Sequence, residues 1–217
     1  MYSIDSLFDL QHTISADYLR QFRYPWEALN GIKAFITETG PQLGEDYTEL
    51  APQVWVHKTA AIAPTAFLGA PCIIGSGTEV RHGAFIRSSA LVGNGCVVGN
   101  SVELKNVILF DKVQVPHYNY VGDSILGYKA HMGAGSITSN VKSDRSLVVI
   151  HGSEDIPTGI KKVGAFLGDG AEIGCNSVLN PGVVVGRNST VYPLSCVRGV
   201  VPENSIYKAE AVIVKKA

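Results

Sequence analysis

The stretch Val98-Gly99-Asn100-Ser101-Val102-Glu103-Leu104-Lys105 decides the fold. Its aliphatic residues Val98 and Leu104 stand six positions apart, and small or polar residues fill most of the steps between them. The same spacing recurs from about Val54 to Tyr207. A period of six matches neither an α-helix nor a flat strand. It fits a solenoid coil of three short parallel strands, each with one aliphatic residue directed inward. The sequence therefore predicts a parallel β-helix.

The corners between these strands are rich in Gly and Asn, as in Gly93-Asn94-Gly95 and Gly186-Arg187-Asn188. Both residue types adopt left-handed backbone conformations at low steric cost. The chain has 217 residues, of which 46% are hydrophobic. This is enough for one elongated domain with a continuous core and a small accessory segment.

Charge and composition exclude several classes of partner. The 18 basic and 19 acidic side chains give a net charge of −1, without the electrostatic footprint of a protein that binds nucleic acid or a membrane surface. No apolar run is long enough to span a bilayer, and the N-terminus lacks the residue order of a signal peptide. We therefore expect a cytoplasmic protein without nucleic acid or membrane partners. Its four cysteines contain no CxxC pair and are expected to be buried or half-buried thiols.

The pattern divides the chain into three parts. Residues 1–50 lack the hexad and have helical spacing, which predicts two short helices flanking Pro25 and, in the simplest arrangement, capping the open end of the core. Residues 51–207 form the predicted β-helix. It contains an inserted loop, 141–161, which is too long for a corner and is the kind of segment that often carries function. Residues 208–217 are a C-terminal tail.

A dense polar and aromatic cluster lies between two irregular steps of the repeat. The inward positions are five residues apart, not six, from Leu104 to Leu109 and from Val121 to Leu126. Neighbouring coils stack about 5 Å apart, so residues about 18 positions apart lie one above the other. This predicts a paired cationic step of Arg87 and Lys105, suited to a phosphate. Glu103 and His117 are 14 positions apart, which is about one coil once the one-residue slip and the corner are allowed for, so we expect them side by side, as a general base requires.

Three runs of sequence stand out together. They are the run from Val98 to Lys105, His117-x-x-Tyr120-Val121-Gly122-Asp123-Ser124-Ile125-Leu126-Gly127 and Gly133-Ala134-Gly135-Ser136-Ile137-Thr138-Ser139-Asn140. On these runs the chain resembles, over about residues 54–205, the C-terminal acetyltransferase half of the bifunctional glucosamine-1-phosphate acetyltransferase and N-acetylglucosamine-1-phosphate uridylyltransferase. The resemblance implies a mainly β, single-stranded left-handed β-helix that assembles as a homotrimer with active sites between subunits. No Gly-rich nucleotide loop precedes Val54, so no uridylyltransferase activity is expected.

This resemblance also implies roles for individual residues. His117 matches the general base that takes a proton from the sugar amine, and Glu103 matches its supporting carboxylate. Asn140 matches an asparagine near the amine and the acetyl group. The remaining substrate-binding positions are Arg87, Lys105, Tyr120 and His131.

The donor site departs from the family pattern. Acetyl-CoA is the implied co-substrate, and no metal is predicted. The matched positions are Asn140, Val141, Cys175 and Pro193, of which the last three differ from the family's Tyr, Ser and Ala; His131 likewise replaces an Asn. The base is retained while several ligand contacts differ, which puts the acceptor in doubt.

The sequence therefore predicts an acetyl-CoA-dependent N-acetyltransferase that acts on an amino-sugar phosphate such as glucosamine 1-phosphate and is related to UDP-N-acetylglucosamine biosynthesis. Three alternatives stay open. The chain is a non-catalytic scaffold or regulatory β-helix, an acyltransferase for another phosphorylated or nucleotide-linked amino sugar, or a metal-dependent hydratase of the γ-carbonic anhydrase type. The hydratase requires a closely spaced His pair, which His117 and His131 do not form.

Overall fold

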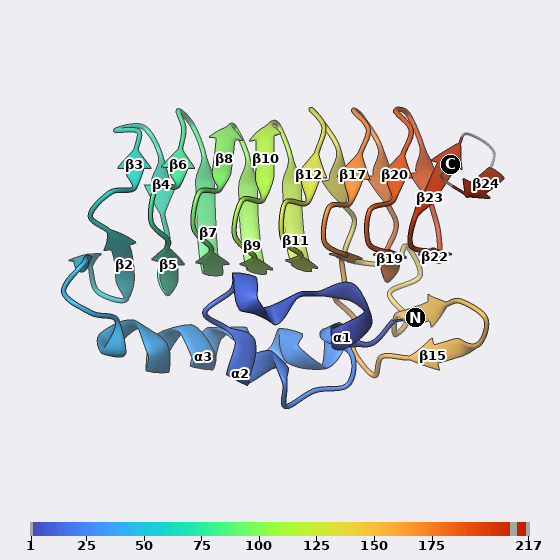
Figure 1. Ribbon diagram of the computed structural model, residues 1–217, viewed down its shortest axis with the longest axis horizontal. Helices are drawn as coiled ribbons and strands as arrows, with labels where there is room; N and C mark the ends of the chain where they lie inside the picture. Colours follow the sequence, from blue (N-terminus) through green and yellow to red (C-terminus); the bar gives the residue numbers. More distant parts are fainter. Residues whose placement is uncertain (1, 209–211, 216–217) are drawn as a thin grey trace.

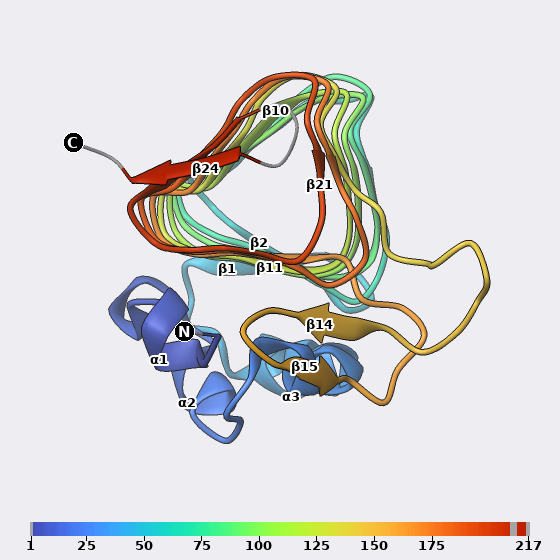
Figure 2. The same cartoon turned by 90° about the vertical axis from the view of Figure 1, so that its right-hand side faces the viewer.

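The chain folds into a three-sided β-helix, shown in a computed structural model that describes residues 2–208 and 212–215 (Figure 1). Figure 2 views the molecule along the axis of the coils, with the C-terminal end toward the reader. Successive coils run clockwise as they approach the reader, so the β-helix is left-handed. The predicted fold class is confirmed, including the hand that the hexad spacing alone leaves open.

The three sides of the prism are called side 1, side 2 and side 3. Side 1 is a nine-stranded sheet in which every strand except β24 runs parallel. Its strands are β3 (Ala61–Ile62), β6 (Glu79–Val80), β8 (Val97–Asn100), β10 (Gln114–His117), β12 (His131–Met132), β17 (Glu172–Ile173), β20 (Thr190–Val191), β23 (Ser205–Lys208) and β24 (Val212–Lys215).

Sides 2 and 3 share one 13-stranded sheet, because three long strands turn the corner between them. These are β7 (Phe85–Val92), β9 (Glu103–Leu109) and β11 (Tyr120–Leu126). Side 2 also contains β4 (Phe67–Leu68), β13 (Ile137–Thr138), β18 (Val178–Leu179) and β21 (Cys196–Val197). Side 3 also contains β1 (Tyr47–Ala51), β2 (Val54–His57), β5 (Cys72–Ile74), β16 (Ala165–Leu167), β19 (Val183–Val185) and β22 (Val200–Val201).

The predicted inward residues form vertical columns inside the prism. On side 1, Val98 lies in register with Val80 below and Val115 above. All three are buried. The side 2 column contains one polar member, Thr138, whose buried hydroxyl accepts a hydrogen bond from the Gly122 N–H at 2.9 Å. The buried Thr138 hydroxyl therefore has a hydrogen-bond partner inside the prism, as a buried polar group requires.

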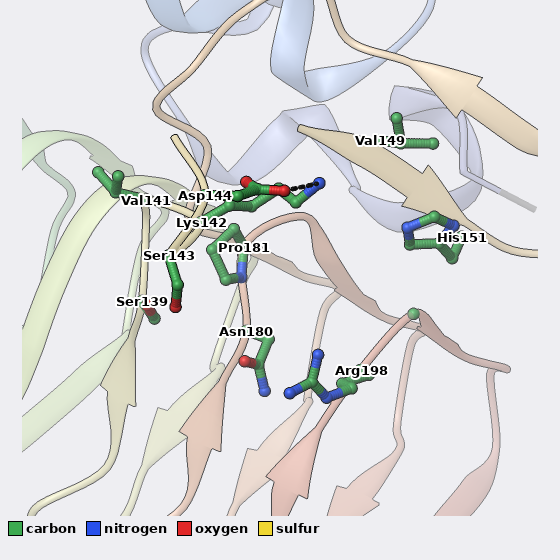
Figure 3. A pocket seen from close by; sticks show the side chains of 11 residues that line it. Ser139, Val141, Lys142, Ser143, Asp144, Val149, His151, Asn180, Pro181 and Arg198 are labelled. Carbon is green, nitrogen blue, oxygen red and sulfur yellow. Dashed lines mark ion pairs between the residues drawn. The ribbon is translucent and has the colours of Figure 1, made fainter. Parts of the chain in front are cut away.

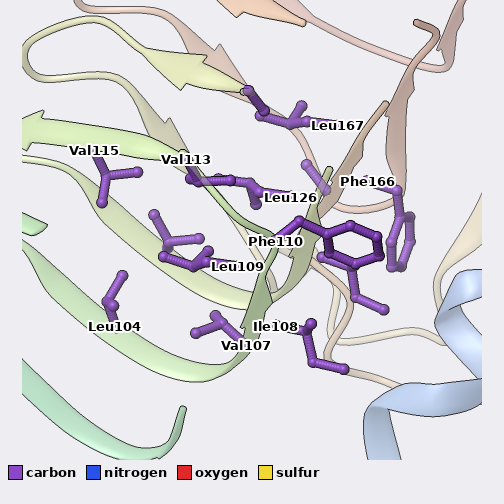
Figure 4. Packing of buried hydrophobic residues seen from close by; sticks show 14 of the residues in the cluster. Leu104, Val107, Ile108, Leu109, Phe110, Val113, Val115, Leu126, Phe166 and Leu167 are labelled. Atoms are coloured by element: carbon purple, nitrogen blue, oxygen red, sulfur yellow. The ribbon is translucent and has the colours of Figure 1, made fainter. Parts of the chain in front are cut away.

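Side 3 differs from the other two because its strands are apolar on both surfaces. Its outward residues are at most 6% exposed over most of its height. Parallel strands buried on both surfaces read as continuous apolar runs, as in Cys72-Ile73-Ile74 and Val183-Val184-Val185. Figure 4 shows part of this packing, with Phe110 and Phe166 near the helical segment. The outward row consists of Trp55, Ile73, Leu91, Ile108, Ile125, Phe166 and Val184.

The helices of the N-terminal segment lie along side 3 and do not cap the end of the prism, so the capping role expected of these helices is wrong (Figures 1 and 2). Aromatic contacts hold the segment against side 3. The ring centroids of Trp26 and Phe166 lie 5.9 Å apart, and those of Phe8 and Phe110 lie 5.1 Å apart. In place of two helices the segment has six short helical pieces, α1 (Ile4–Leu7), η1 (Leu10–His12), α2 (Ala16–Leu19), η2 (Pro25–Gly31), α3 (Ile32–Thr39) and η3 (Gly40–Gln42).

The half-buried carboxylate of Asp169 fixes this segment to the coils. Asp169 accepts hydrogen bonds from the Asp9 N–H at 2.6 Å and the Tyr128 N–H at 2.8 Å, and its own N–H donates to the Leu7 carbonyl. Burial raises the pKa of Asp169, while the two backbone donors and Arg187 oppose that rise.

The inserted loop covers the rest of side 3. Its strands β14 (Val149–His151) and β15 (Asp155–Pro157) pair as an antiparallel hairpin, and Val148 and Ile150 are buried. The Ser153 N–H donates to the Tyr2 hydroxyl at 2.8 Å, which joins the hairpin to the N-terminal segment. The loop is thus an ordered part of the core, not only a surface excursion.

Both ends of the solenoid carry an antiparallel strand. β1 pairs with β2 at one end of side 3, and β24 pairs with β23 at the other end of side 1. These strands cover edges that would otherwise present unpaired backbone groups. Residues 212–215 of the predicted tail form β24, and residues 209–211, 216 and 217 fall outside the described residues. No described helix has the length and hydropathy needed to cross a membrane.

We predict that Trp26→Ala lowers the free energy of unfolding by about 3–5 kcal/mol, because a large buried ring leaves a cavity against side 3. Trp26 is 2% exposed. Urea titration followed by circular dichroism measures the change. The control is Leu50→Ala, since Leu50 is 59% exposed and should change stability by less than about 0.5 kcal/mol. Equal stability of the two variants would contradict the docking of the segment on side 3.

Candidate functional site

Side 2 carries a connected polar network centred on the Asp123 carboxylate. The Lys105 ammonium donates to Asp123 Oδ1 at 2.8 Å, and the Asn140 amide donates to Asp123 Oδ2 at 2.6 Å. The Asn106 amide also donates to Asp123, at 2.9 Å, and the same amide reaches the Leu29 carbonyl of the N-terminal segment. The Asp123 side chain is 4% exposed. The charge of Asp123 is therefore buried but well compensated.

Tyr120 connects the network around Asp123 with Glu103 on side 2. Its hydroxyl accepts a hydrogen bond from the Asn140 amide at 3.2 Å, and its backbone lies in register with Glu103. Burial raises the pKa of Tyr120, and the nearby Asp123 and Glu103 carboxylates raise it further. The hydroxyl therefore stays protonated at neutral pH and can donate to a ligand. The structure thus brings together Glu103, Lys105, Tyr120 and Asn140.

Arg87 and Lys105 lie on neighbouring coils, but not in the simple one-coil register expected for the cationic step. Strand β7 has six steps between its inward residues Ile86 and Val92, whereas β9 has five between Leu104 and Leu109. The extra residue produces a shift in register, so Ser88 lies opposite Lys105. Arg87 instead contacts Glu103, with 3.3 Å between Nη1 and Oε1. Each cation thus has its own carboxylate.

His117 lies at the corner between sides 1 and 2, at the end of β10. Its side chain is exposed, and among the described residues its ring nitrogens have no hydrogen-bond or ion-pair partner. Within the described residues Glu103 and His117 therefore do not form the expected contact, because the Glu103 carboxylate accepts a hydrogen bond from the Arg87 guanidinium. His117 stands three residues before Tyr120, across the corner from the network.

The corner itself is built by Asn119, which is 2% exposed. Its amide donates to the Gly133 carbonyl at 2.8 Å and to the Ser136 carbonyl at 3.1 Å, and its oxygen accepts from the His117 N–H. Tyr118 takes a left-handed conformation, with φ of 52°, between His117 and Asn119. This local geometry turns His117 outward.

Three of the predicted site residues share one column at this corner. The backbone ladder joins equivalent corners: the Gly135 N–H donates to the His117 carbonyl, the Asn176 N–H to Ala134, and the Leu194 N–H to Cys175. The column therefore runs through His117, Ala134, Cys175 and Pro193. With coils about 5 Å apart, Cys175 and Pro193 lie above His117 toward the C-terminal end. His82, two coils below His117, belongs to the same column.

The remaining two predicted residues lie elsewhere. His131 begins β12 on side 1, where its Nδ1 is 2.9 Å from the Glu172 carboxylate. Val141 lines a pocket of about 350 Å³ between the start of the inserted loop and the C-terminal coils. Figure 3 shows Val141, Lys142 and Asp144 on one side of this pocket and Asn180 with Arg198 on the other.

Sequence reasoning missed Asp123 and Asn119 as organising residues, although both belong to the polar cluster it noted. A signal was present for Asp123, which follows Lys105 by 18 residues and so stands one coil above it. No group of three or more His, Cys, Asp or Glu side chains suited to a metal occurs within residues 2–208 and 212–215.

The fold and these corners define a hexapeptide-repeat β-helix protein. A family model described as the GMPPB C-terminal domain matches residues 70–154. The chain is 29% identical over 204 residues to the bifunctional protein GlmU of Methanococcus maripaludis, a match that covers 92% of this chain and 49% of that protein. The predicted resemblance to this enzyme is confirmed, and the chain spans about half of its length.

Other relatives match shorter segments. A bifunctional sugar-1-phosphate nucleotidylyltransferase/acetyltransferase of Sulfurisphaera tokodaii is 32% identical over 108 residues, which is 49% of this chain and 27% of that protein. Among solved structures, a hexapeptide transferase family protein of Anaplasma phagocytophilum has 18% identity and a TM-score of 0.43, with 75% of this chain and 78% of that chain covered. A point mutant of AntD, an N-acyltransferase of Bacillus cereus, in complex with dTDP and coenzyme A has 17% identity and a TM-score of 0.44, with 75% and 79% covered.

We predict that two of the four cysteines react rapidly with a thiol reagent in the folded protein. Cys175 and Cys196 are exposed, whereas burial raises the pKa of Cys72 and Cys96 to about 12 and suppresses their reactive thiolates. Absorbance after addition of Ellman's reagent counts the reactive groups, and Cys175→Ser should leave one. A third thiol that reacts at the same rate without denaturant would contradict the burial described.

Proposed function

We propose that this protein is an acyl-CoA-dependent N-acyltransferase that transfers an acetyl group from acetyl-CoA to the amine of a phosphorylated amino sugar, such as glucosamine 1-phosphate. The observation that carries the proposal is that His117 lies next to both the corner column and the polar network around Asp123. The corner column leads from His117 to Cys175 and Pro193. The polar network with Glu103, Tyr120 and Asn140 begins three residues beyond His117.

These two features correspond to the two substrates. The column is assigned to the donor, because Cys175 and Pro193 match donor positions of the resembling enzyme. The network is assigned to the acceptor, because Arg87 and Lys105 supply cations and the Tyr120 hydroxyl supplies a donor. Both ligands then reach the exposed imidazole of His117 from different directions. Direct attack requires such a meeting of amine, thioester and base.

The reaction needs one base and no covalent intermediate. The lone pair of the amine attacks the thioester carbonyl carbon, and His117 accepts the proton that the nitrogen loses. The C–S bond then breaks, and the departing thiolate of coenzyme A takes a proton from the imidazolium. The products are an N-acetyl amino sugar and free coenzyme A. Backbone N–H groups near Cys175 are suited to stabilise the oxyanion that forms in between.

The proposal includes a homotrimer, with each site between two subunits. Side 2 leaves Phe67 57% exposed and Phe85 41% exposed, with ring centroids 5.5 Å apart. Exposed apolar patches of this kind are typical of subunit contacts. Because Glu103 is engaged by Arg87 in its own chain, a neighbouring subunit is also a source of the group that would orient the His117 ring.

We predict that His117→Ala lowers kcat/KM by about 10²–10⁴, since it removes the general base. Release of free thiol from acetyl-CoA in the presence of glucosamine 1-phosphate measures the rate. The matched control is His82→Ala, which removes an exposed histidine from the same column two coils away and should retain full activity. Equal activities of His117→Ala and wild type would exclude His117 as the base. Absence of transfer in wild type with several phosphorylated and nucleotide-linked amino sugars would favour the scaffold alternative.

We predict that Lys105→Met raises the KM for the phosphorylated acceptor by about 10- to 100-fold and changes kcat less, because the charge contacts a phosphate that is alike in ground and transition states. Steady-state kinetics at several acceptor concentrations separates the two constants. Lys58→Met removes an exposed lysine next to β2, in the first coil of the prism, and serves as the control. A lower kcat at constant KM would assign Lys105 to the chemical step.

A further inference from the structure

A second hollow, of about 490 Å³, lies at the edge of side 2 where three parts of the chain meet. The N-terminal segment contributes Lys33, the end of the inserted loop contributes Lys161 and Lys162, and β9 contributes Lys105. We call this hollow the lysine pocket. Asn30 and Asn106 also line it, and Asp123 lies at its floor.

The lysine pocket has an excess of positive charge. It gathers four lysines and one carboxylate, although the whole chain has a net charge of −1. Lys105 compensates Asp123, which also accepts from two amides and is 4% exposed. Lys33, Lys161 and Lys162 form no ion pair with any acidic side chain in the part of the chain that the structure describes.

Lysines without an ion pair also occur elsewhere among the described residues, as at Lys58, Lys112 and Lys129, so the distinguishing feature of this pocket is that four lysines and one carboxylate line the same hollow. In the pocket beside Val141, Lys142 lies 3.8 Å from the Asp144 carboxylate, and His151 lies 2.9 Å from that of Asp155. Lys33, Lys161 and Lys162 line one hollow without such partners, so their positive charges favour an anion that binds there. An ammonium group presents three N–H donors, and several of them around one hollow suit the oxygens of more than one phosphate.

The lysine pocket lies a short distance along side 2 from His117. Six residues of chain, from His117 to Asp123, lead from the corner across side 2 to the floor of the pocket. At about 3.3 Å per residue, this path is at most about 20 Å long. A ligand with its amine at His117 and its phosphates at the lysines must pass over Tyr120 and Glu103. An amino sugar with one phosphate is a shorter ligand than one that carries a diphosphate and a nucleoside.

We infer that the lysine pocket binds the diphosphate of a nucleotide-linked amino sugar, and that this compound is the acceptor in place of the sugar monophosphate. The inference rests on the proposed function for the role of the amine. The N-terminal segment and the inserted loop then have a part in substrate recognition, since they supply three of the four lysines.

The first experiment measures binding by isothermal titration calorimetry at low ionic strength, with UDP-glucosamine, glucosamine 1-phosphate and coenzyme A as separate probes. We expect wild type to bind UDP-glucosamine more tightly than glucosamine 1-phosphate. Lys161→Met/Lys162→Met should raise the Kd for UDP-glucosamine about tenfold or more, since it removes two charged donors. The control Lys58→Met/Lys215→Met removes two exposed lysines elsewhere and should leave each Kd within about twofold.

Three results would overturn the inference. An unchanged Kd for UDP-glucosamine in the Lys161/Lys162 variant would remove the pocket from ligand binding. Equal weakening in the control variant would indicate a general effect of net charge. Selective loss of coenzyme A binding would assign the pocket to the diphosphate of the donor.

Acetyl transfer separates this inference from the proposed function. Binding as expected, without thiol release from acetyl-CoA, would uphold the lysine pocket and reject the acyltransferase. Efficient transfer to glucosamine 1-phosphate, unchanged in the Lys161/Lys162 variant and with no binding of UDP-glucosamine, would uphold the acyltransferase and reject the diphosphate site.

Discussion

The arrangement of the molecule depends on the apolar outer surface of side 3. A hexapeptide solenoid needs only its inward residues to be apolar, yet here Ile73, Leu91 and Phe166 are also buried on the outside. At roughly 25 cal/mol per Å² of apolar surface removed from water, covering such a row stabilises the fold substantially. The N-terminal segment and the β14–β15 hairpin provide that cover (Figure 2). Both are therefore structural parts of the prism.

The same packing brings cations to the edge of side 2. The Asn106 amide links the Leu29 carbonyl to Asp123, so the N-terminal segment is hydrogen-bonded to the polar network. Lys33 follows Leu29 by about one helical turn, and Lys161 and Lys162 end the inserted loop on the other side. In our account, residues outside the hexad repeat thus decide which phosphorylated acceptor fits, while the repeat itself supplies His117 and its column.

Much of the fold could be predicted from the sequence because the hexad specifies it locally. The inward positions, such as Val98 and Leu104, are all determined by one spacing. The packing of the N-terminal segment was not predicted, although runs such as Val183-Val184-Val185 indicated strands buried on both surfaces. The candidate site was predicted less well. Arg87 and Lys105 are separated by one coil in sequence, but one extra residue in β7 shifts the register and gives each its own carboxylate. The five-residue step from Leu104 to Leu109 signalled this shift, but the spacing alone does not determine which outward side chains then contact one another.

The central claim is that the corner at His117 joins a donor and an amino-sugar acceptor for direct transfer. The most direct test is to follow free thiol and N-acetyl product together, with wild-type protein, acetyl-CoA and a set of phosphorylated and nucleotide-linked amino sugars. The account predicts thiol release only when an acceptor amine is present, in a one-to-one ratio with N-acetylated sugar. Thiol release that does not depend on the amine, or no product with any member of the set, would contradict it.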